Sequence, residues 1–324
     1  MNKRFFLLAV TLLLAVFLTA GCFPGQSSTS PRKADAPAYL VVQDSTGRTV
    51  TIPKKPERIV VLSPSFLELL YAVGGNAAGR PSSKTDAIPQ AALPVPEVGY
   101  VYNINLEKVT ALQPDLVIAM QGMHEDLVAP LGNSHIPVIT LKYKTIDDTF
   151  AAIDLFGKIV GAPDRAEQVA EQVRLQMQAV VGKVPAGPPV KVAILHATAK
   201  SVTVEMDSTI AGSIAKALGF ANIAAGSDSL HTGGNMVPYS LETLVAADPD
   251  ALFVVTMGSQ AEIEKRMQAD VASNPAWSSL RAVQRQKVYF LPADLFLLNP
   301  GLQMPAAFQY MAKLIYPEVY GSDR

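Results

Sequence analysis

A repeated segment constrains the fold of this chain more than any other feature of its sequence. LEKVTALQPDLVIAM, Leu106 to Met120, aligns with LETLVAADPDALFVV, Leu241 to Val255, with Leu, Glu, Ala, Pro and Asp identical at five positions. Each copy predicts a short amphipathic helix, a Pro-Asp turn and a buried strand of a parallel sheet. In each turn, Asp115 or Asp250 is expected to hydrogen-bond local amides. The repeat therefore predicts two copies of one α/β unit.

The segments that precede the two copies also correspond. RIVVLSPS, Arg58 to Ser65, and KVAILHAT, Lys191 to Thr198, each join a basic start to an apolar run and a polar exit. Two similar α/β lobes follow from this correspondence.

A helical section lies between the lobes. Its apolar residues recur at spacings of three and four, Gly161-Ala162-Pro163-Asp164 interrupts and restarts the helix, and PAGPP marks its end. We therefore place an N-terminal lobe at 39–146, a helical connector at 147–184 and a C-terminal lobe at 185–324. Because such a connector is stiff, we expect small rocking of the lobes rather than wide hinge closure.

The first residues predict export. A basic start, an apolar run and small residues up to position 21 are typical of a secretory signal peptide. Cys22 is the only cysteine and follows Leu18-Thr19-Ala20-Gly21, which resembles a bacterial lipobox, so we expect it to be lipidated. The Ser- and Pro-rich residues at 22–38 predict a flexible tether. The formal net charge of −1 gives no indication of nucleic-acid binding.

Glu68 is the single acid in LSPSFLELLYAVGG, which otherwise predicts a buried helix. If Ser65 is the N-cap, Glu68 completes a capping box. If Ser63 is the N-cap and Pro64 the first helical residue, Glu68 lies a turn inside and must point outward.

The carboxyl ends of the predicted strands indicate where a ligand binds, because open α/β sheets bind ligands there. The loops after these strands carry Gln121, His124, His196 and Met257. Further loops expected at the same edge, and the start of the first helix, extend the candidate ligand-binding set to Ser65, Phe66, Arg80, Tyr100, Tyr102, His231, Met236, Tyr239 and Phe296.

Several of these residues have a structural alternative. His196 can hydrogen-bond a backbone carbonyl, His124 can be solvent-exposed at a helix start, and Arg80 can pair with a nearby acid. Tyr100 and Tyr102 alternate along an extended segment, so only one of them should face the cleft. The spacing of Trp277, the only tryptophan, predicts packing rather than ligand contact.

The ordered set of segments resembles the iron-complex and cobalamin substrate-binding proteins of ABC importers. These segments run from RIVVLSPSFLELLYAVGG through PEVGYVYNINLEKVTALQPDLVIA and KVAILHA to NPAWSSLRAVQRQKVYFLP. The resemblance implies two Rossmann-like α/β lobes joined by a long rigid helix, with the ligand cleft between them. It also implies delivery of cargo to a membrane permease with its ATPase, by a monomer anchored through lipid at the outer face of the cytoplasmic membrane.

The resemblance assigns permease docking to an acid on the first helix of each lobe. In the N-terminal lobe that acid is Glu68. The corresponding helix of the C-terminal lobe, STIAGSIAKALGFANIA, contains no acid. Either Asp207 just before it is the substitute, or docking there is weaker or differently arranged.

The cargo is expected to be a metal chelate rather than a bare ion, because the four histidines lack HxxxH or HxH spacing. A ferric siderophore ranks first. Haem, with His196 or His231 as a possible axial ligand, and cobalamin are the alternatives. No intrinsic cofactor is expected. No GxSxG, GxGxxG or cysteine nucleophile suggests an enzyme, and an anchored sensor or adhesion module is the alternative of another class.

Overall fold

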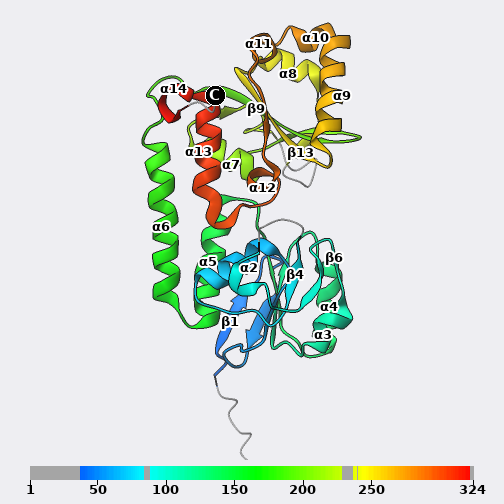
Figure 1. Ribbon diagram of the computed structural model, residues 1–324, viewed down its shortest axis with the longest axis vertical. Helices are drawn as coiled ribbons and strands as arrows, with labels where there is room; N and C mark the ends of the chain where they lie inside the picture. Colours follow the sequence, from blue (N-terminus) through cyan, green and yellow to red (C-terminus); the bar gives the residue numbers. More distant parts are fainter. Residues whose placement is uncertain (1–36, 84–87, 228–235, 239, 322–324) are drawn as a thin grey trace, which may run out of the picture. The chain divides into compact units, whose positions relative to one another are not determined.

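The structure is a computed structural model that describes residues 37–83, 88–227, 236–238 and 240–321. The chain divides into two units, Met1–Pro37 and Ala38–Arg324, and the fold described below is that of the second. Figure 1 shows its elements in chain order. Within the described ranges, no helix is both long and apolar enough to cross a membrane.

The N-terminal lobe is built on a parallel sheet in the order β3-β7-β8, which comprises Ile59–Val61, Leu116–Met120 and Val138–Leu141. Two smaller sheets accompany it: β1 (Leu40–Gln43) with β2 (Thr49–Ile52), and β4 (Arg80–Ser82) with β5 (Glu97–Tyr100) and β6 (Asn103–Ile104). The helices of this lobe are α2 (Pro64–Ala72), η1 (Gln90–Ala92), α3 (Leu106–Ala111) and α4 (Glu125–Asn133).

The C-terminal lobe is built on a mixed sheet. Its strand order is β12-β10-β9-β13-β14, with β11 also paired to β9. The strands are β9 (Lys191–Thr198), β10 (Val202–Glu205), β11 (Ala221–Asn222), β12 (Met236–Pro238), β13 (Ala251–Met257) and β14 (Val288–Leu291). The helices are α7 (Ile210–Ala217), α8 (Leu241–Ala247), α9 (Gln260–Ser273), α10 (Pro275–Ser278), α11 (Arg281–Gln284), α12 (Ala293–Phe296), η3 (Gly301–Gln303), α13 (Met304–Ile315) and α14 (Pro317–Tyr320).

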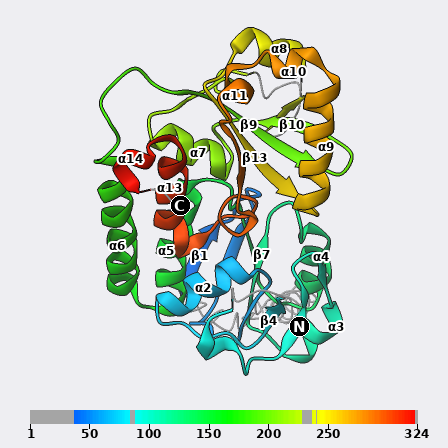
Figure 2. The ribbon, with the colours of Figure 1, turned by 45° about the horizontal axis from the view of Figure 1, so that its top comes forward.

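The sequence repeat is confirmed as a structural repeat. The first copy forms α3 and β7, the second forms α8 and β13, and β13 pairs in parallel with both β9 and β14. Helices cover both faces of the sheet in the C-terminal lobe, where α13 and α9 lie on opposite sides (Figure 2). The fold class is therefore α/β, as the sequence predicts.

The aspartates of the repeat have different partners from those expected. The carboxylate of Asp115 accepts the amides of Glu57 and Arg58, each at 2.9 Å, and that of Asp250 accepts the amide of Lys191 at 3.1 Å. These amides belong to the start of the neighbouring strand, so the expectation of bonds within the turn is wrong. Each aspartate fixes the start of one parallel strand beside another, a link that a turn motif alone does not specify.

The connector consists of two helices that pack against each other, α5 (Ile146–Val160) and α6 (Pro163–Val181). Thr145 and Asp148 form a capping box at the start of α5, and Gly161 ends it with φ 70°, which is left-handed. A Cβ added to Gly157 would lie 2.4 Å from the Cβ of Ala166, so this glycine permits the close approach of the two helices. The interruption predicted at Gly161-Ala162-Pro163-Asp164 is the turn between these two helices, and α6 restarts at Pro163 as predicted.

Apolar and polar contacts join the lobes. Phe150 of α5 and Leu302 of η3 pack against the cores of both lobes. The hydroxyl of Ser65 donates to the carbonyl of Asn299 at 3.1 Å, and Asn299, which is 4% exposed, also exchanges hydrogen bonds with Thr149. The domain boundaries stated above stay a prediction. Trp277 is buried in the C-terminal core, as its spacing predicts.

Candidate functional site

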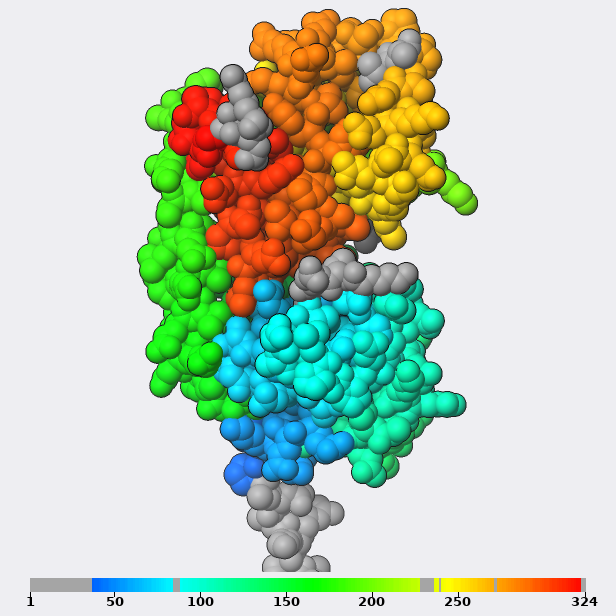
Figure 3. All heavy atoms as spheres, in the orientation of Figure 1, coloured from blue at the N-terminus to red at the C-terminus, as the bar shows by residue number. Residues whose placement is uncertain are grey.

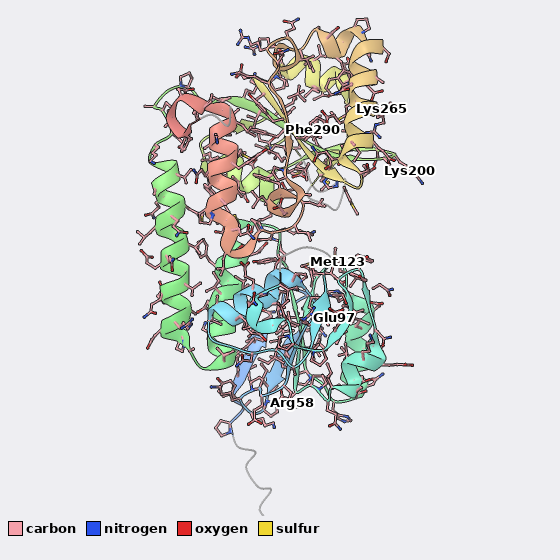
Figure 4. All side chains as sticks on the ribbon, in the orientation of Figure 1. Arg58, Glu97, Met123, Lys200, Lys265 and Phe290 are labelled. Atoms are coloured by element: carbon pink, nitrogen blue, oxygen red, sulfur yellow. The ribbon has the colours of Figure 1, made fainter. Side chains whose placement is uncertain are left out.

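A pocket of ≈ 500 Å³ lies between the two lobes. The N-terminal lobe lines it with Met120, Gln121, Gly122, Met123, Tyr143 and Lys144. The C-terminal lobe lines it with His196, Glu205, Thr209, Ile210, Met236, Phe296, Leu297, Leu298 and Asn299. Figure 3 shows the surface indented between the two lobes, and in Figure 4 Met123 lies at the edge of the N-terminal lobe that faces the C-terminal lobe.

The pocket lies at the carboxyl ends of strands in both lobes, as the sequence predicts. Met120 ends β7, and Tyr143 and Lys144 follow β8 closely. On the other side His196 lies near the carboxyl end of β9. Parallel strands bring their carboxyl ends to one edge of each sheet, so residues far apart in sequence converge there.

A histidine and a glutamate form the most polar part of the C-terminal wall. Nδ1 of His196 lies 3.0 Å from Oε1 of Glu205. Thr203 of β10 is opposite His196 of β9, so Glu205, two residues further along, projects from the same face and is the diagonal neighbour of His196. Met236 of β12 is opposite Glu205 and also lines the pocket. We call this arrangement the His196–Glu205 pair.

Lys144 and Tyr143 line the pocket on the side of the N-terminal lobe. The ammonium of Lys144 has no ion pair among the described residues, whereas nearby Lys142 lies 3.7 Å from Asp148. Tyr143 is 6% exposed and packs on Phe66, with 4.7 Å between ring centroids. Burial raises the pKa of the Tyr143 phenol, so its hydroxyl stays protonated at neutral pH. The pocket therefore has a positive group on one side and a carboxylate–imidazole pair on the other.

Four of the predicted ligand-binding residues line this pocket: Gln121, His196, Met236 and Phe296. For His196 the partner is the side chain of Glu205, not a backbone carbonyl, so that alternative is wrong. Lys144 and Glu205 were not predicted. The signal for Glu205 is an acid that ends the alternating strand VTVE beside the strand carrying His196, and Lys144 lies three residues after the apolar run VITL.

Two of the predicted residues are structural instead. His124 is 2% exposed: its Nδ1 accepts the amide of Met120 at 2.9 Å, so its Nε2 donates to the carbonyl of Val101 at 2.7 Å. Burial lowers the pKa of His124 and keeps it neutral. Arg80 is 8% exposed and pairs with Glu97 at 2.9 Å, the alternative stated for it. Neither lines the pocket, and the solvent-exposed alternative for His124 is wrong.

The remaining predicted residues lie around the pocket or in the core. Phe66 is fully buried in the N-terminal core, and Ser65 bonds the C-terminal lobe instead of facing open space. Met257 is 59% exposed at the end of β13 and is absent from the described lining. Tyr100 and Tyr102 stack with ring centroids 5.5 Å apart, so the expectation that they face opposite ways is wrong. The turn between β5 and β6 brings both rings to one side. Cys22, His231 and Tyr239 lie outside the described residues.

Helix α2 shows whether Glu68 caps the helix or points outward. Its N-cap is Ser63 with Pro64 in the first turn, so Glu68 forms no capping box. Glu68 does not project freely either: it is half-buried, and its Oε2 accepts the amide of Leu302 at 3.4 Å. Burial raises the pKa of Glu68. The expectation of a free surface acid is wrong because η3 packs against α2. Asp207 accepts a hydrogen bond from Asn222 at 3.2 Å.

The described residues contain no group of three or more His, Cys, Asp or Glu side chains arranged to hold a metal ion. The polar groups of the pocket are instead one carboxylate–imidazole pair, one ammonium and neutral donors such as Gln121 and Asn299. Two α/β lobes with a pocket of this kind between them define a two-lobed binding protein.

Comparison with known proteins agrees with this class. The family model described as "Periplasmic binding protein" matches residues 59–295, and the chain belongs to this family. It is 28% identical over 331 residues to the uncharacterized ABC transporter substrate-binding lipoprotein YvrC of Bacillus subtilis, covering 99% of each chain. It is 31% identical over 268 residues to the Fe(3+) dicitrate-binding periplasmic protein FecB of Escherichia coli, covering 81% of this chain and 85% of that one.

The fold is also that of solved structures. An ABC transporter substrate-binding protein from Listeria monocytogenes superposes with a TM-score of 0.73 at 23% identity, over 81% of this chain and 98% of that one. At this identity the likeness concerns the fold alone.

Proposed function

We propose that the protein is an extracytoplasmic substrate-binding lipoprotein of an ABC importer, which captures an iron(III) chelate and delivers it to the permease. Family membership supports the binding role, and the relatives named for ABC transport and for ferric dicitrate support the importer and the cargo class. A ferric siderophore, including a citrate complex, is the proposed cargo.

The arrangement of charge in the pocket carries this proposal. Lys144 supplies a positive charge from the N-terminal lobe without an acid partner among the described residues, and the His196–Glu205 pair lies in the opposite lobe. An anionic iron chelate presents carboxylate, hydroxamate or catecholate oxygens, which an ammonium and amide donors bind well. Capture needs contacts from both lobes at once, and a pocket of ≈ 500 Å³ is in the range of small-molecule sites.

The location and the anchor follow from the start of the chain. We propose cleavage before Cys22 and lipidation of this residue, which would hold a monomer at the outer face of the cytoplasmic membrane. The relative YvrC is named a lipoprotein, which supports the anchor. Globomycin inhibits the peptidase specific for prolipoproteins, and its addition should therefore make the unprocessed precursor accumulate.

The permease contact stays a prediction for Glu68 and Asp207. Glu68 is half-buried beside Leu302, so a permease arginine would have to displace an existing hydrogen bond to reach it. Stimulation of the permease's ATPase by the loaded protein would separate a transport role from that of an anchored sensor or adhesion module.

A haem or cobalamin cargo is the alternative, and one observation favours it. The pocket walls also contain Ile210, Phe296, Leu297 and Leu298, apolar side chains that suit a macrocycle. A Soret band or corrin bands in the bound state would identify these cargoes.

The test compares two lysines of one segment. Ferric citrate binding is measured by equilibrium dialysis with radioactive iron for the wild type, Lys144→Ala and Lys142→Ala. Loss of a charge-assisted hydrogen bond in the pocket should weaken binding about tenfold or more in Lys144→Ala. Lys142 pairs with Asp148 and does not line the pocket, so its variant should bind like the wild type. Equal affinities for the two variants would contradict the placement of the anion beside Lys144.

A further inference from the structure

The His196–Glu205 pair contains a buried carboxylate that is only partly satisfied. Glu205 is 3% exposed, and its Oε1 contacts Nδ1 of His196 at 3.0 Å. Its Oε2 is buried and has no hydrogen-bond partner among the described residues. A buried carboxylate is unfavourable unless hydrogen bonds or a charge compensate it. The hydrogen bond from His196 is the contact that does so among the described residues.

His196 is the group that compensates this carboxylate. Because a carboxylate oxygen accepts, Nδ1 of His196 carries the hydrogen of the bond to Glu205. Lys144 belongs to the opposite wall, and no described arginine or lysine forms an ion pair with Glu205.

The second ring nitrogen of His196 is available to a ligand. Only Nδ1 has a hydrogen-bond partner among the described residues, and the side chain lines the pocket. A histidine whose Nδ1–H is held by a carboxylate presents a basic Nε2, an arrangement found in metal sites. A metal at Nε2 leaves the Nδ1–H bond to Glu205 in place, so the imidazole keeps its orientation and the buried carboxylate keeps its partner.

We infer that Nε2 of His196 coordinates the metal of the cargo, and that Glu205 is the positioning residue that fixes the imidazole for this bond. The inference rests on the proposed function and names the cargo class more closely: an iron(III) chelate with an open or water-filled coordination position, such as a citrate complex. A hexadentate chelate leaves no position for an imidazole. On binding, a water ligand leaves the metal and the lone pair of Nε2 takes its place.

The first experiment observes the imidazole itself. Protein labelled with ¹⁵N-histidine is titrated with gallium(III) citrate, a diamagnetic probe for the iron(III) complex. We expect the Nε2 resonance of His196 to shift, because the metal binds the lone pair of this nitrogen. The resonances of His135, an exposed histidine with φ 59°, should not move.

The second experiment uses variants and a saturated chelate. Glu205→Gln and His196→Asn should weaken ferric citrate binding by about 10–100-fold, as loss of a metal ligand or its supporting carboxylate does. His135→Asn is the control and should bind like the wild type, because Asn also tolerates its left-handed backbone. Any binding of a hexadentate ferric tris-hydroxamate should be unaffected by all three substitutions.

The outcomes separate this inference from the proposed function. Tight binding of gallium citrate with an unmoved His196 resonance would overturn the inference and leave the proposed function standing. Binding of the tris-hydroxamate but not of citrate would have the same meaning. If the protein bound neither chelate, the proposed function would fail and the inference with it.

Discussion

The contact between the lobes at Gly301 makes a quantitative prediction. Gly301 has φ 60°, and a Cβ added there would lie 2.7 Å from Oε2 of Glu68. Gly301→Ala therefore has two unfavourable effects. The left-handed backbone costs an alanine roughly 1–2 kcal/mol. Displacement of the Glu68 carboxylate adds about 1 kcal/mol through the lost hydrogen bond to Leu302.

A matched control separates the two effects. Gly219 has φ 76° and nothing within 4 Å of its added Cβ, so Gly219→Ala has only the backbone effect. We expect urea denaturation to give a free energy of unfolding lower by about 1–2 kcal/mol for Gly219→Ala and by about 2–3 kcal/mol for Gly301→Ala. In the double variant Gly301→Ala/Glu68→Ala the collision is absent, so the two substitutions should couple favourably.

The reasoning is refuted if Gly301→Ala and Gly219→Ala destabilise equally, or if removal of the Glu68 side chain leaves the effect of Gly301→Ala unchanged. Either result would mean that Glu68 does not lie against η3.

Two further predictions concern acids. Asp115→Ala removes two hydrogen bonds to backbone amides, whereas Asp250→Ala removes one and a solvent-accessible ion pair with Arg281, which contributes little. Thermal or urea denaturation should therefore show the larger loss for Asp115→Ala, about 2 kcal/mol against about 1 kcal/mol; a larger loss for Asp250→Ala would contradict this. Burial raises the pKa of Glu68 above its unfolded value of 4.5, so its protonated form stabilises the fold at low pH, and this contribution is lost as pH rises through the folded pKa. Glu68→Gln should therefore gain stability relative to the wild type as pH rises from 4 through that window to 7, measured by denaturation at each pH, and a constant difference would argue against the burial of Glu68.

Sequence reasoning predicted the elements that local pattern determines. The repeat gave the helix–turn–strand units of both lobes, and Pro64 indicated the first residue of α2. Both depend on interactions within a few residues, such as proline geometry and apolar spacing.

Contacts between distant segments were the part that the sequence did not reveal. Glu68 was expected at the surface because nothing in α2 shows that η3, more than 200 residues later, covers it. Glu205 was missed because only the pairing of β9 with β10 brings it beside His196. His124 and Arg80 were expected in the site because loop position alone does not distinguish a ligand-binding side chain from one that fixes the loop.

Iron retention tests the account most directly. The purified protein is mixed with ferric citrate, separated from free iron by gel filtration, and measured for iron content and for charge-transfer absorption. We predict one iron per chain in the wild type, bound in the pocket that Lys144 and His196 line from opposite lobes. Protein that elutes without iron, and is equally unable to retain haem or cobalamin, would contradict the account.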